Sequence, residues 1–122
     1  MTGEKRLFAL RGATQCKNEE DDIILQVSLL YDALLTQNNL EERDIVSVIF
    51  SVTADIDAKN PAAALRVSGR AADLALFALQ EASVRGGLER TIRLLIHGYL
   101  PEASRPRHIY RNGAEILRPD RG

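Results

Sequence analysis

The chain is poor in cysteine, histidine and aromatic residues, and each shortage excludes a class of protein. Its 122 residues include one cysteine, two histidines and no tryptophan, and 5% are aromatic. A single cysteine excludes a disulfide framework and a cysteine-based zinc cluster, and it is typical of a reducing compartment, so we expect a cytoplasmic protein. Two histidines argue against a metal site built by the protein alone.

Long apolar runs are also lacking. No stretch approaches the roughly 20 apolar residues that cross a bilayer, and the N-terminal segment MTGEKRLFALRG has no apolar core of a signal peptide. We therefore expect neither export nor a membrane partner. The length and the 45% of apolar residues fit a single globular domain over residues 1–122 with one hydrophobic core.

The charges are balanced in number but segregated along the chain. There are 16 basic and 17 acidic residues in all. The first half, residues 1–61, has 6 basic and 11 acidic residues, whereas residues 62–122 have 10 basic and 6 acidic residues, and all ten of these cations are arginine. Arginine grips a carboxylate or phosphate at two points, so the second half is suited to bind an anion. A codon bias of the genome would produce the same excess.

Apolar periodicity and chain breakers divide the sequence into alternating strands and helices. We expect strands at 6–12, 45–53, 74–80 and within 88–99, and helices at 18–39 and 61–69. Asn18 and Asn60 are suited to cap the helices, and the acidic run 19–22 matches a helix start better than a metal site. The run 74–80 is ambiguous between helix and strand, and we assign it to a strand. Asn112-Gly113, between 108–111 and 114–117, predicts a β-hairpin.

This order of elements predicts an α+β fold, with a mixed β-sheet and two helices on one face. Two helices leave one sheet face or edge uncovered unless subunits associate. We therefore expect a homo-oligomer.

Charged side chains interrupt the apolar pattern of the strands. Arg11, Arg93 and Arg118 lie in or beside strands, as do Glu81 and Tyr110. An unpaired guanidinium is costly to bury, so each arginine faces solvent, pairs with an acid or lines a polar pocket. For one arginine alone the first two placements are favoured. For the three together, a shared anion pocket is the better interpretation.

Seven blocks of sequence occur in the order and spacing of one known family. The blocks are 11–14 (RGAT), 51–56 (SVTADI), 61–66 (PAAALR), 80–81 with 86–88 (QE and GGL), 92–93 (IR), 107–110 (RHIY) and 117–120 (LRPD). None is specific alone, but in register from about Leu7 to Asp120 they resemble the small trimeric chorismate mutases of the Bacillus type. The resemblance implies a homotrimer that forms a pseudo-α/β-barrel, with active sites between neighbouring subunits.

The resemblance also implies an isomerase of the shikimate pathway, which rearranges the dicarboxylate chorismate to prephenate on the way to phenylalanine and tyrosine. By family position, the site takes Arg11, Glu81, Arg93 and Tyr110 from one subunit; Arg66 comes from the neighbour or guards the entrance, Ala62 and Ala78 contact the substrate, and Leu117 and Arg118 close the pocket. A one-substrate pericyclic reaction requires no nucleophile, general base, metal or cofactor.

The implied roles follow from the residue types. Arg11 and Tyr110 are suited to hold the two carboxylates, which restrains the flexible enolpyruvyl arm over the ring. Arg93 is suited to stabilise the charge that develops on the ether oxygen as the C–O bond breaks. Glu81 either accepts a hydrogen bond from the ring hydroxyl and orients Arg93, or forms a salt bridge without touching the substrate.

Three positions depart from the family pattern. Asn60 replaces a common aromatic residue, Ala63 a common lysine, and Ala78 a cysteine, while Lys59 could supply the missing charge. We expect these departures to alter the affinity for substrate rather than to abolish the chemistry. Because the chain ends at Gly122 with little tail, we also expect weaker substrate capture.

Two other functions stay open at this stage. These departures allow a non-catalytic or differently specific trimer of the same fold that binds another small carboxylate. The arginine excess allows a nucleic-acid surface, but the chain has no basic run and no recognition motif. We therefore expect no nucleic-acid partner.

Overall fold

The fold is one sheet with two helices against it, seen in a computed structural model that describes residues 3–117. Arg118 lies outside the described residues. The elements are β1 (Lys5–Gln15), α1 (Glu20–Asn38), the 3₁₀ turn η1 (Glu42–Asp44), β2 (Ile45–Val52), α2 (Pro61–Val67), β3 (Leu76–Gln80), β4 (Thr91–Pro101), β5 (Ile109–Arg111) and the 3₁₀ turn η2 (Ala114–Leu117). None of the helices in this part of the chain has the length and apolar character needed to cross a bilayer.

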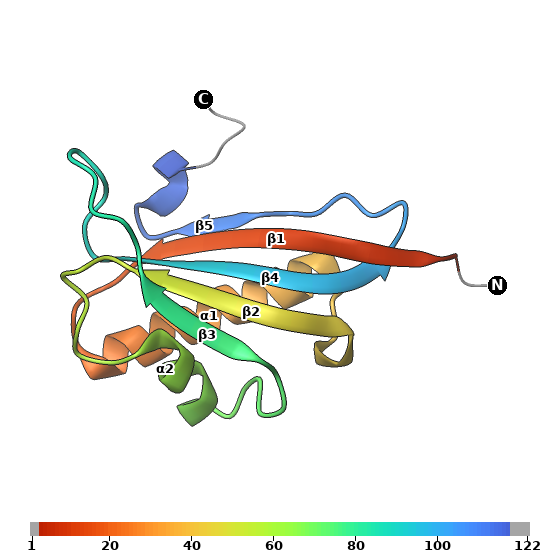
Figure 1. Ribbon diagram of the computed structural model, residues 1–122, viewed down its shortest axis with the longest axis horizontal. Coiled ribbons are helices and arrows are strands. Elements are labelled where there is room, and N and C mark those ends of the chain that lie inside the picture. The colour runs from red at the N-terminus through yellow and green to blue at the C-terminus, as the bar shows by residue number, and fades with distance from the viewer. Residues whose placement is uncertain (1–2, 118–122) are drawn as a thin grey trace.

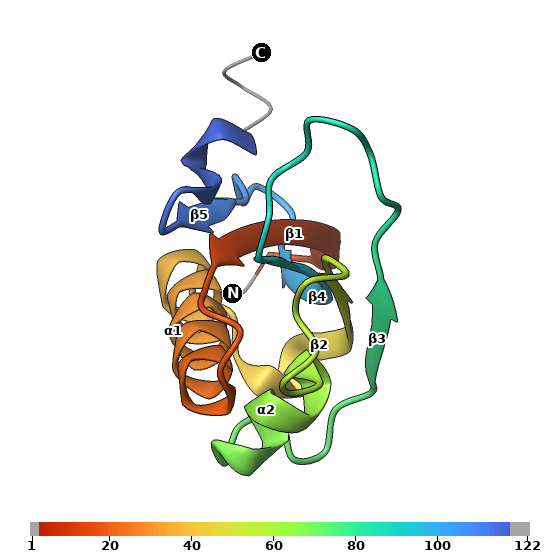
Figure 2. The same ribbon diagram turned by 90° about the vertical axis from the view of Figure 1, so that its left-hand side faces the viewer.

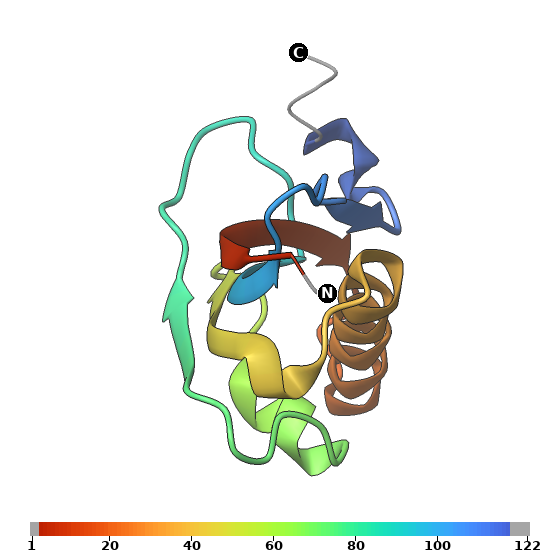
Figure 3. The same ribbon diagram turned by 90° about the vertical axis from the view of Figure 1, so that its right-hand side faces the viewer.

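The five strands form one mixed sheet in the order β3-β2-β4-β1-β5. β4 is antiparallel to both of its neighbours, β1 and β2, whereas β3 runs parallel to β2 and β5 runs parallel to β1. β1, β2 and β3 therefore point the same way and are joined through α1 and α2. Right-handed crossovers in one direction across a sheet place both helices on the same face, and the end-on views show this (Figures 2 and 3).

Alternation along the strands separates a buried face from an open one. The side chains of Leu10, Val48, Phe50, Leu94 and Ile96 are at most 2% exposed and pack with α1 and α2. Their strand neighbours point to the other side, which neither α1 nor α2 covers. We call this side the open face; its members include Leu7, Arg11, Ser47, Ile49, Ser51, Phe77, Leu79, Arg93, Leu95, His97 and Tyr99.

The predicted α+β sheet with two helices on one face is confirmed, but the β-hairpin is wrong. Asn112 and Gly113 do have the left-handed backbone that an Asn-Gly turn uses, with φ of 55° and 101°. The residues before the turn nevertheless pair in parallel with β1, and those after it form η2. The Asn112 amide explains the difference, because it donates to Thr14 Oγ1 (3.1 Å) and Gln26 Oε1 (2.7 Å) and so fixes the turn against β1 and α1.

One of the two predicted helix caps is also wrong. Asn60 caps α2 as expected, with its side-chain oxygen accepting from the backbone of Ala62 (2.8 Å). For α1 the N-cap is Glu19 and not Asn18. The Asn18 side chain instead bonds the loop after β2, donating to Asp57 and accepting from two backbone N–H groups there.

Asp55 ties the end of β2 to the start of β4. Its Oδ1 accepts from Thr53 Oγ1 (2.5 Å), and its two oxygens accept from the Arg90 backbone N–H (3.1 and 3.0 Å). Thr53 Oγ1 in turn accepts from the Thr91 backbone N–H (2.9 Å). These hydrogen bonds hold the pKa of the Asp55 carboxyl below its usual 3.8, and the bond from Thr53 has the largest effect.

The Asp55→Asn variant is expected to be less stable than the wild type at pH 7, by about 1 kcal/mol. A lowered carboxyl pKa stabilises the folded state at pH values above the unfolded-state pKa, and this effect is lost as the pH falls through the lower, folded-state pKa. Denaturant unfolding between pH 7 and pH 3 measures this difference, which should shrink as the carboxyl is protonated. A difference that does not change with pH would contradict the role of the charge.

Candidate active site

Four of the predicted site residues line one depression at an end of the open face. Its volume is about 280 Å³. We call it the arginine pocket; it is lined by Arg11, Gly12, Ala13, Ile49, Ser51, Arg93, Leu94, Leu95, Tyr110 and Leu117. Residues from β1, β2, β4, β5 and η2 thus meet there, although Arg11 and Leu117 lie more than a hundred positions apart in the chain. Figure 1 shows η2 and the loop after β3 rising at this same end of the sheet.

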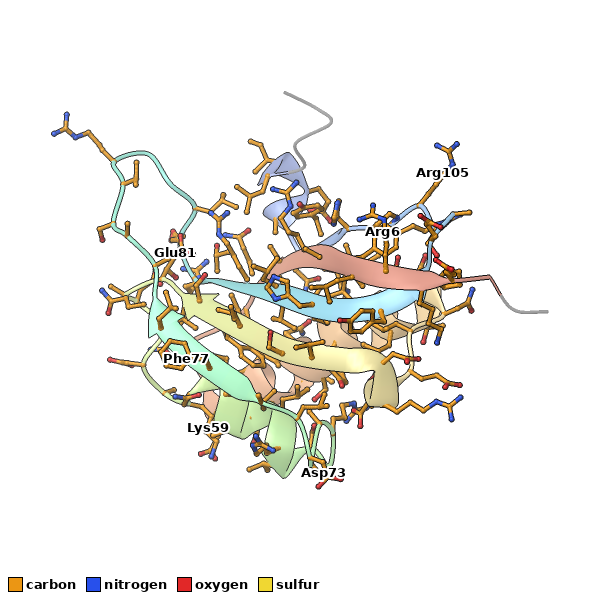
Figure 4. All side chains as sticks on the ribbon, turned by 45° about the vertical axis from the view of Figure 1, so that its right-hand side comes forward. Arg6, Lys59, Asp73, Phe77, Glu81 and Arg105 are labelled. Carbon is orange, nitrogen blue, oxygen red and sulfur yellow. The ribbon has the colours of Figure 1, made fainter. Side chains whose placement is uncertain are left out.

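Arg93 is held by an acid beside the pocket. On β4, Arg93 lies directly opposite Ser51 of β2, and its Nε donates to Glu81 Oε1 at 3.1 Å. Ser51 Oγ donates to the same carboxylate oxygen at 3.3 Å. Glu81 follows β3, and Figure 4 shows it at the base of the loop that leads to β4. The predicted Arg93–Glu81 pair therefore exists as an ion pair, with the two side chains 44% and 22% exposed.

Arg11 and Tyr110 reach the pocket from two paired strands. β5 pairs with β1 so that Tyr110 lies beside Ala13. The Arg11 backbone N–H donates to His108 Nδ1 at 3.0 Å, which extends the contact between the two segments by one residue. Gly12 makes room for α1 beneath, since a Cβ there would lie 2.8 Å from Leu34 Cδ1.

The C-terminal wall of the pocket is fixed by Gln26 on α1. Gln26 Oε1 accepts from Asn112 Nδ2 (2.7 Å) and from Arg111 Nη1 (3.2 Å). The two donors directly follow Tyr110 and precede η2, whose last residue, Leu117, lines the pocket. Gln26 therefore sets the position of both wall residues without lying in the pocket itself.

Ala78 lies elsewhere, in a second depression of about 330 Å³ between α2 and the edge strand β3. We call this the α2 pocket; it is lined by Val52, Ile56, Asp57, Lys59, Asn60, Pro61, Ala78, Leu79 and Gln80. Ala62 is the next residue after Pro61 and packs against the core. Lys59 forms an ion pair with Glu20 (3.4 Å). The three departures from the family pattern thus fall in or beside this second pocket.

Arg66 makes contacts that the sequence did not predict. Its guanidinium donates to the backbone carbonyls of Ala71 (2.9 Å), Ala72 (2.8 Å) and Leu74 (2.7 Å), in the segment between α2 and β3. Within the described chain, Arg66 therefore supports the approach to β3. Its predicted contact with a substrate stays a prediction.

Sequence reasoning did not identify Ser51, Ile49 or Leu95 as pocket residues. The strand pattern could have identified them, because all three alternate with core residues on β2 or β4 and share a face with Arg93. Cys16 is buried, and burial raises the pKa of its thiol to about 11, so it is protonated and unreactive at neutral pH. Residues 3–117 contain no cluster of three or more His, Cys, Asp or Glu side chains suited to a metal.

The chemistry available in the arginine pocket is electrostatic. Two guanidinium groups and a phenol face a cavity with apolar walls at Ile49, Leu95 and Leu117. Fixed donors beside an apolar wall bind an anion with an apolar body and stabilise negative charge that develops on it. The pocket suits a small carboxylate whose reaction needs positioning and charge stabilisation.

Comparison with known proteins agrees with this chemistry. Residues 7–121 match the family model described as chorismate mutase type I. Chorismate mutase AroH from Bacillus subtilis strain 168 is 30% identical to the chain over 114 residues, which are 91% of this chain and 89% of that protein. Chorismate mutase AroH from Thermus thermophilus is 32% identical over 114 residues, 91% of this chain and 93% of that protein.

A solved structure is similar as well. The chorismate mutase from Clostridium thermocellum superposes with a TM-score of 0.82 and 39% identity, over 90% of this chain and 99% of that one. The family match spans nearly the whole chain, and the fold of the relative is the mixed sheet and helix pair described above. On sequence and structure together, the chain belongs to the type I chorismate mutase family and is a chorismate mutase.

Proposed function

We propose that the arginine pocket is the place where this enzyme binds chorismate and rearranges it to prephenate. The observation that carries the proposal is Arg93, whose guanidinium is oriented by Glu81 at 3.1 Å and borders a cavity with apolar walls. Chorismate has two carboxylates and an apolar ring, which match the arginines and the walls. Within residues 3–117, Arg93 donates hydrogen bonds only through Nε, so its two terminal amino groups are available for a ligand.

The reaction needs shape and charge rather than proton transfer. The ether C–O bond of chorismate breaks while a C–C bond forms between the enolpyruvyl arm and the ring, and no atom enters or leaves. Arg11 and Tyr110 are in position to bind carboxylates, and holding the arm over the ring lowers the entropic part of the barrier. Ile49 and Leu95 supply the apolar surface on which the ring rests.

Arg93 provides the electrostatic part of catalysis in this proposal. Because C–O cleavage runs ahead of C–C formation, negative charge gathers on the ether oxygen in the transition state. A guanidinium fixed beside that oxygen stabilises the transition state more than the substrate, which is what raises kcat. In this proposal Glu81 orients the guanidinium and accepts a hydrogen bond from the ring hydroxyl.

We propose further that three chains assemble and that each active site forms between two of them. Leu7, Phe77, Leu79 and Tyr99 on the open face are 43–64% exposed, an apolar surface that a second copy would cover. Within one chain, four of the predicted site residues line the arginine pocket, whereas Ala78 lines the α2 pocket and Ala62 follows its lining residue Pro61. Assembly would bring one chain's arginine pocket against a neighbour's α2 pocket. The cytoplasmic location stays a prediction from the single cysteine.

The alternative is a trimer that binds a different small carboxylate. The departures from the family pattern favour it, since Asn60 and Ala78 line the α2 pocket and Ala63 lies nearby on α2. An assay that follows the decrease in chorismate absorbance after purified protein is added, without metal or cofactor, distinguishes the two functions. Saturable turnover supports the proposed reaction, and a rate equal to the uncatalysed background contradicts it.

The Arg93→Ala variant is expected to lower kcat at least about 10³-fold, because it removes a fixed charged donor from the developing charge. Arg105→Ala is the matched control, because Arg105 is exposed and lies at the opposite end of the sheet (Figure 4). It should keep full activity. If Arg93→Ala changes KM and leaves kcat intact, Arg93 binds the substrate but does not stabilise the transition state.

Light scattering should give a mass of about 40 kDa, three times the 13.5 kDa of one chain. A shared site also predicts complementation between two impaired variants, Arg93→Ala in the arginine pocket and Ala78→Leu in the α2 pocket. Co-expressed at equal levels, they form trimers in which about one site in four has two unaltered halves. Activity should rise to about a quarter of the wild-type value. If each site lies within one chain, the mixture will show only the mean of the two variants.

A further inference from the structure

We propose that Ser51 is a positioning residue for catalysis, which acts on Arg93 through the carboxylate of Glu81. The inference rests on the proposed function of Arg93. Ser51 lies on β2 in the open face, half-buried, directly opposite Arg93 and at the edge of the arginine pocket. Its hydroxyl donates to Glu81 Oε1 (3.3 Å), the oxygen that also accepts from Arg93 Nε (3.1 Å).

The Arg93–Glu81 pair alone restrains its own geometry only weakly. With side chains 44% and 22% exposed, it is a partly solvated ion pair. Pairs of this kind contribute roughly 0.2–1 kcal/mol, which is comparable to thermal energy and leaves other rotamers populated. Transition-state stabilisation requires the guanidinium to be in place beforehand. A further restraint on the carboxylate is therefore needed.

Glu81 is restrained at both ends. Its backbone N–H donates to the Val52 carbonyl at 2.9 Å, which continues the β2–β3 ladder one residue beyond β3. Its carboxylate is held by Ser51, the residue just before Val52. Neighbouring residues of one strand therefore bond the backbone and the side chain of Glu81, which restrains Oε1 toward Arg93. Ser51 supplies the side-chain half of this restraint.

Ser47 offers a matched comparison on the same strand. It also lies on the open face of β2, is half-buried, and contacts a side chain from β4, with its Oγ 3.2 Å from His97 Nδ1. It does not line the arginine pocket and does not contact Glu81. Removing its hydroxyl therefore changes the sheet surface in the same way while leaving the Arg93 support intact.

The Ser51→Ala variant is expected to lower kcat about tenfold, the effect of losing one hydrogen bond to a charged group. KM should change less than about twofold, because the Ser51 hydroxyl is proposed to bond Glu81 rather than the substrate. Ser51→Thr should restore kcat to near the wild-type value, since threonine keeps the hydroxyl and suits a strand. Ser47→Ala should keep wild-type kcat. Unfolding midpoints and masses in solution should match the wild type for all three variants.

A double-mutant cycle separates action through Glu81 from direct contact with chorismate. In the Glu81→Ala background, the Ser51→Ala change should have almost no further effect on kcat, because the group it acts on is gone. A further tenfold loss in that background, or a rise in KM without a fall in kcat, would overturn the positioning role. If Arg93→Ala abolishes turnover while Ser51→Ala leaves it unchanged, this inference fails and the proposed function stands. If Arg93→Ala is itself fully active, the proposed function fails first.

Discussion

The handedness of the strand connections determines which side of the sheet this protein can use for chemistry. β1, β2 and β3 follow one another in one direction across the sheet, so both connecting helices lie on the same side. Two helices are enough to bury that side, and residues 3–117 contain no further helix of comparable size to cover the other. The open face therefore results from chain connectivity, and its side chains are free of the packing demands of the core.

Strand alternation lets each strand serve both sides at once. On β4, Ile92 and Leu94 fill the core between the sheet and the helices, and Arg93 between them points to the open face. On β2, Phe50 and Ser51 divide the two tasks in the same way. The core residues fix the strands in register, and the register places Ser51 opposite Arg93. The geometry of the arginine pocket is thus set by the packing on the reverse side of the sheet.

The sequence predicts the strands and helices well because the apolar periods are strong, but it does not predict how the C-terminal segment pairs. Asn112-Gly113 adopts the expected turn backbone, yet its hydrogen-bond partners are Thr14 and Gln26, which lie 98 and 86 residues from Asn112. Local context predicts Asn18 as the cap of α1, but its side chain forms hydrogen bonds with the distant loop after β2. The site shows the same division. Arg93 and Glu81 stand out as charges among apolar residues, whereas Ser51 is an ordinary strand residue until the register shows what it faces.

The short fifth strand makes one wall of the arginine pocket less firmly held than the rest of the sheet. β5 contributes only three residues to the sheet, whereas β1 and β4 pair over eleven. The wall that carries Tyr110 and Leu117 is therefore held by a short parallel ladder and by the side-chain hydrogen bonds from Arg111 and Asn112 to Gln26. Segments with few backbone bonds open locally at a much lower free-energy cost than the whole domain. Local opening of this wall would leave the main strands, and any contacts between chains on the open face, in place.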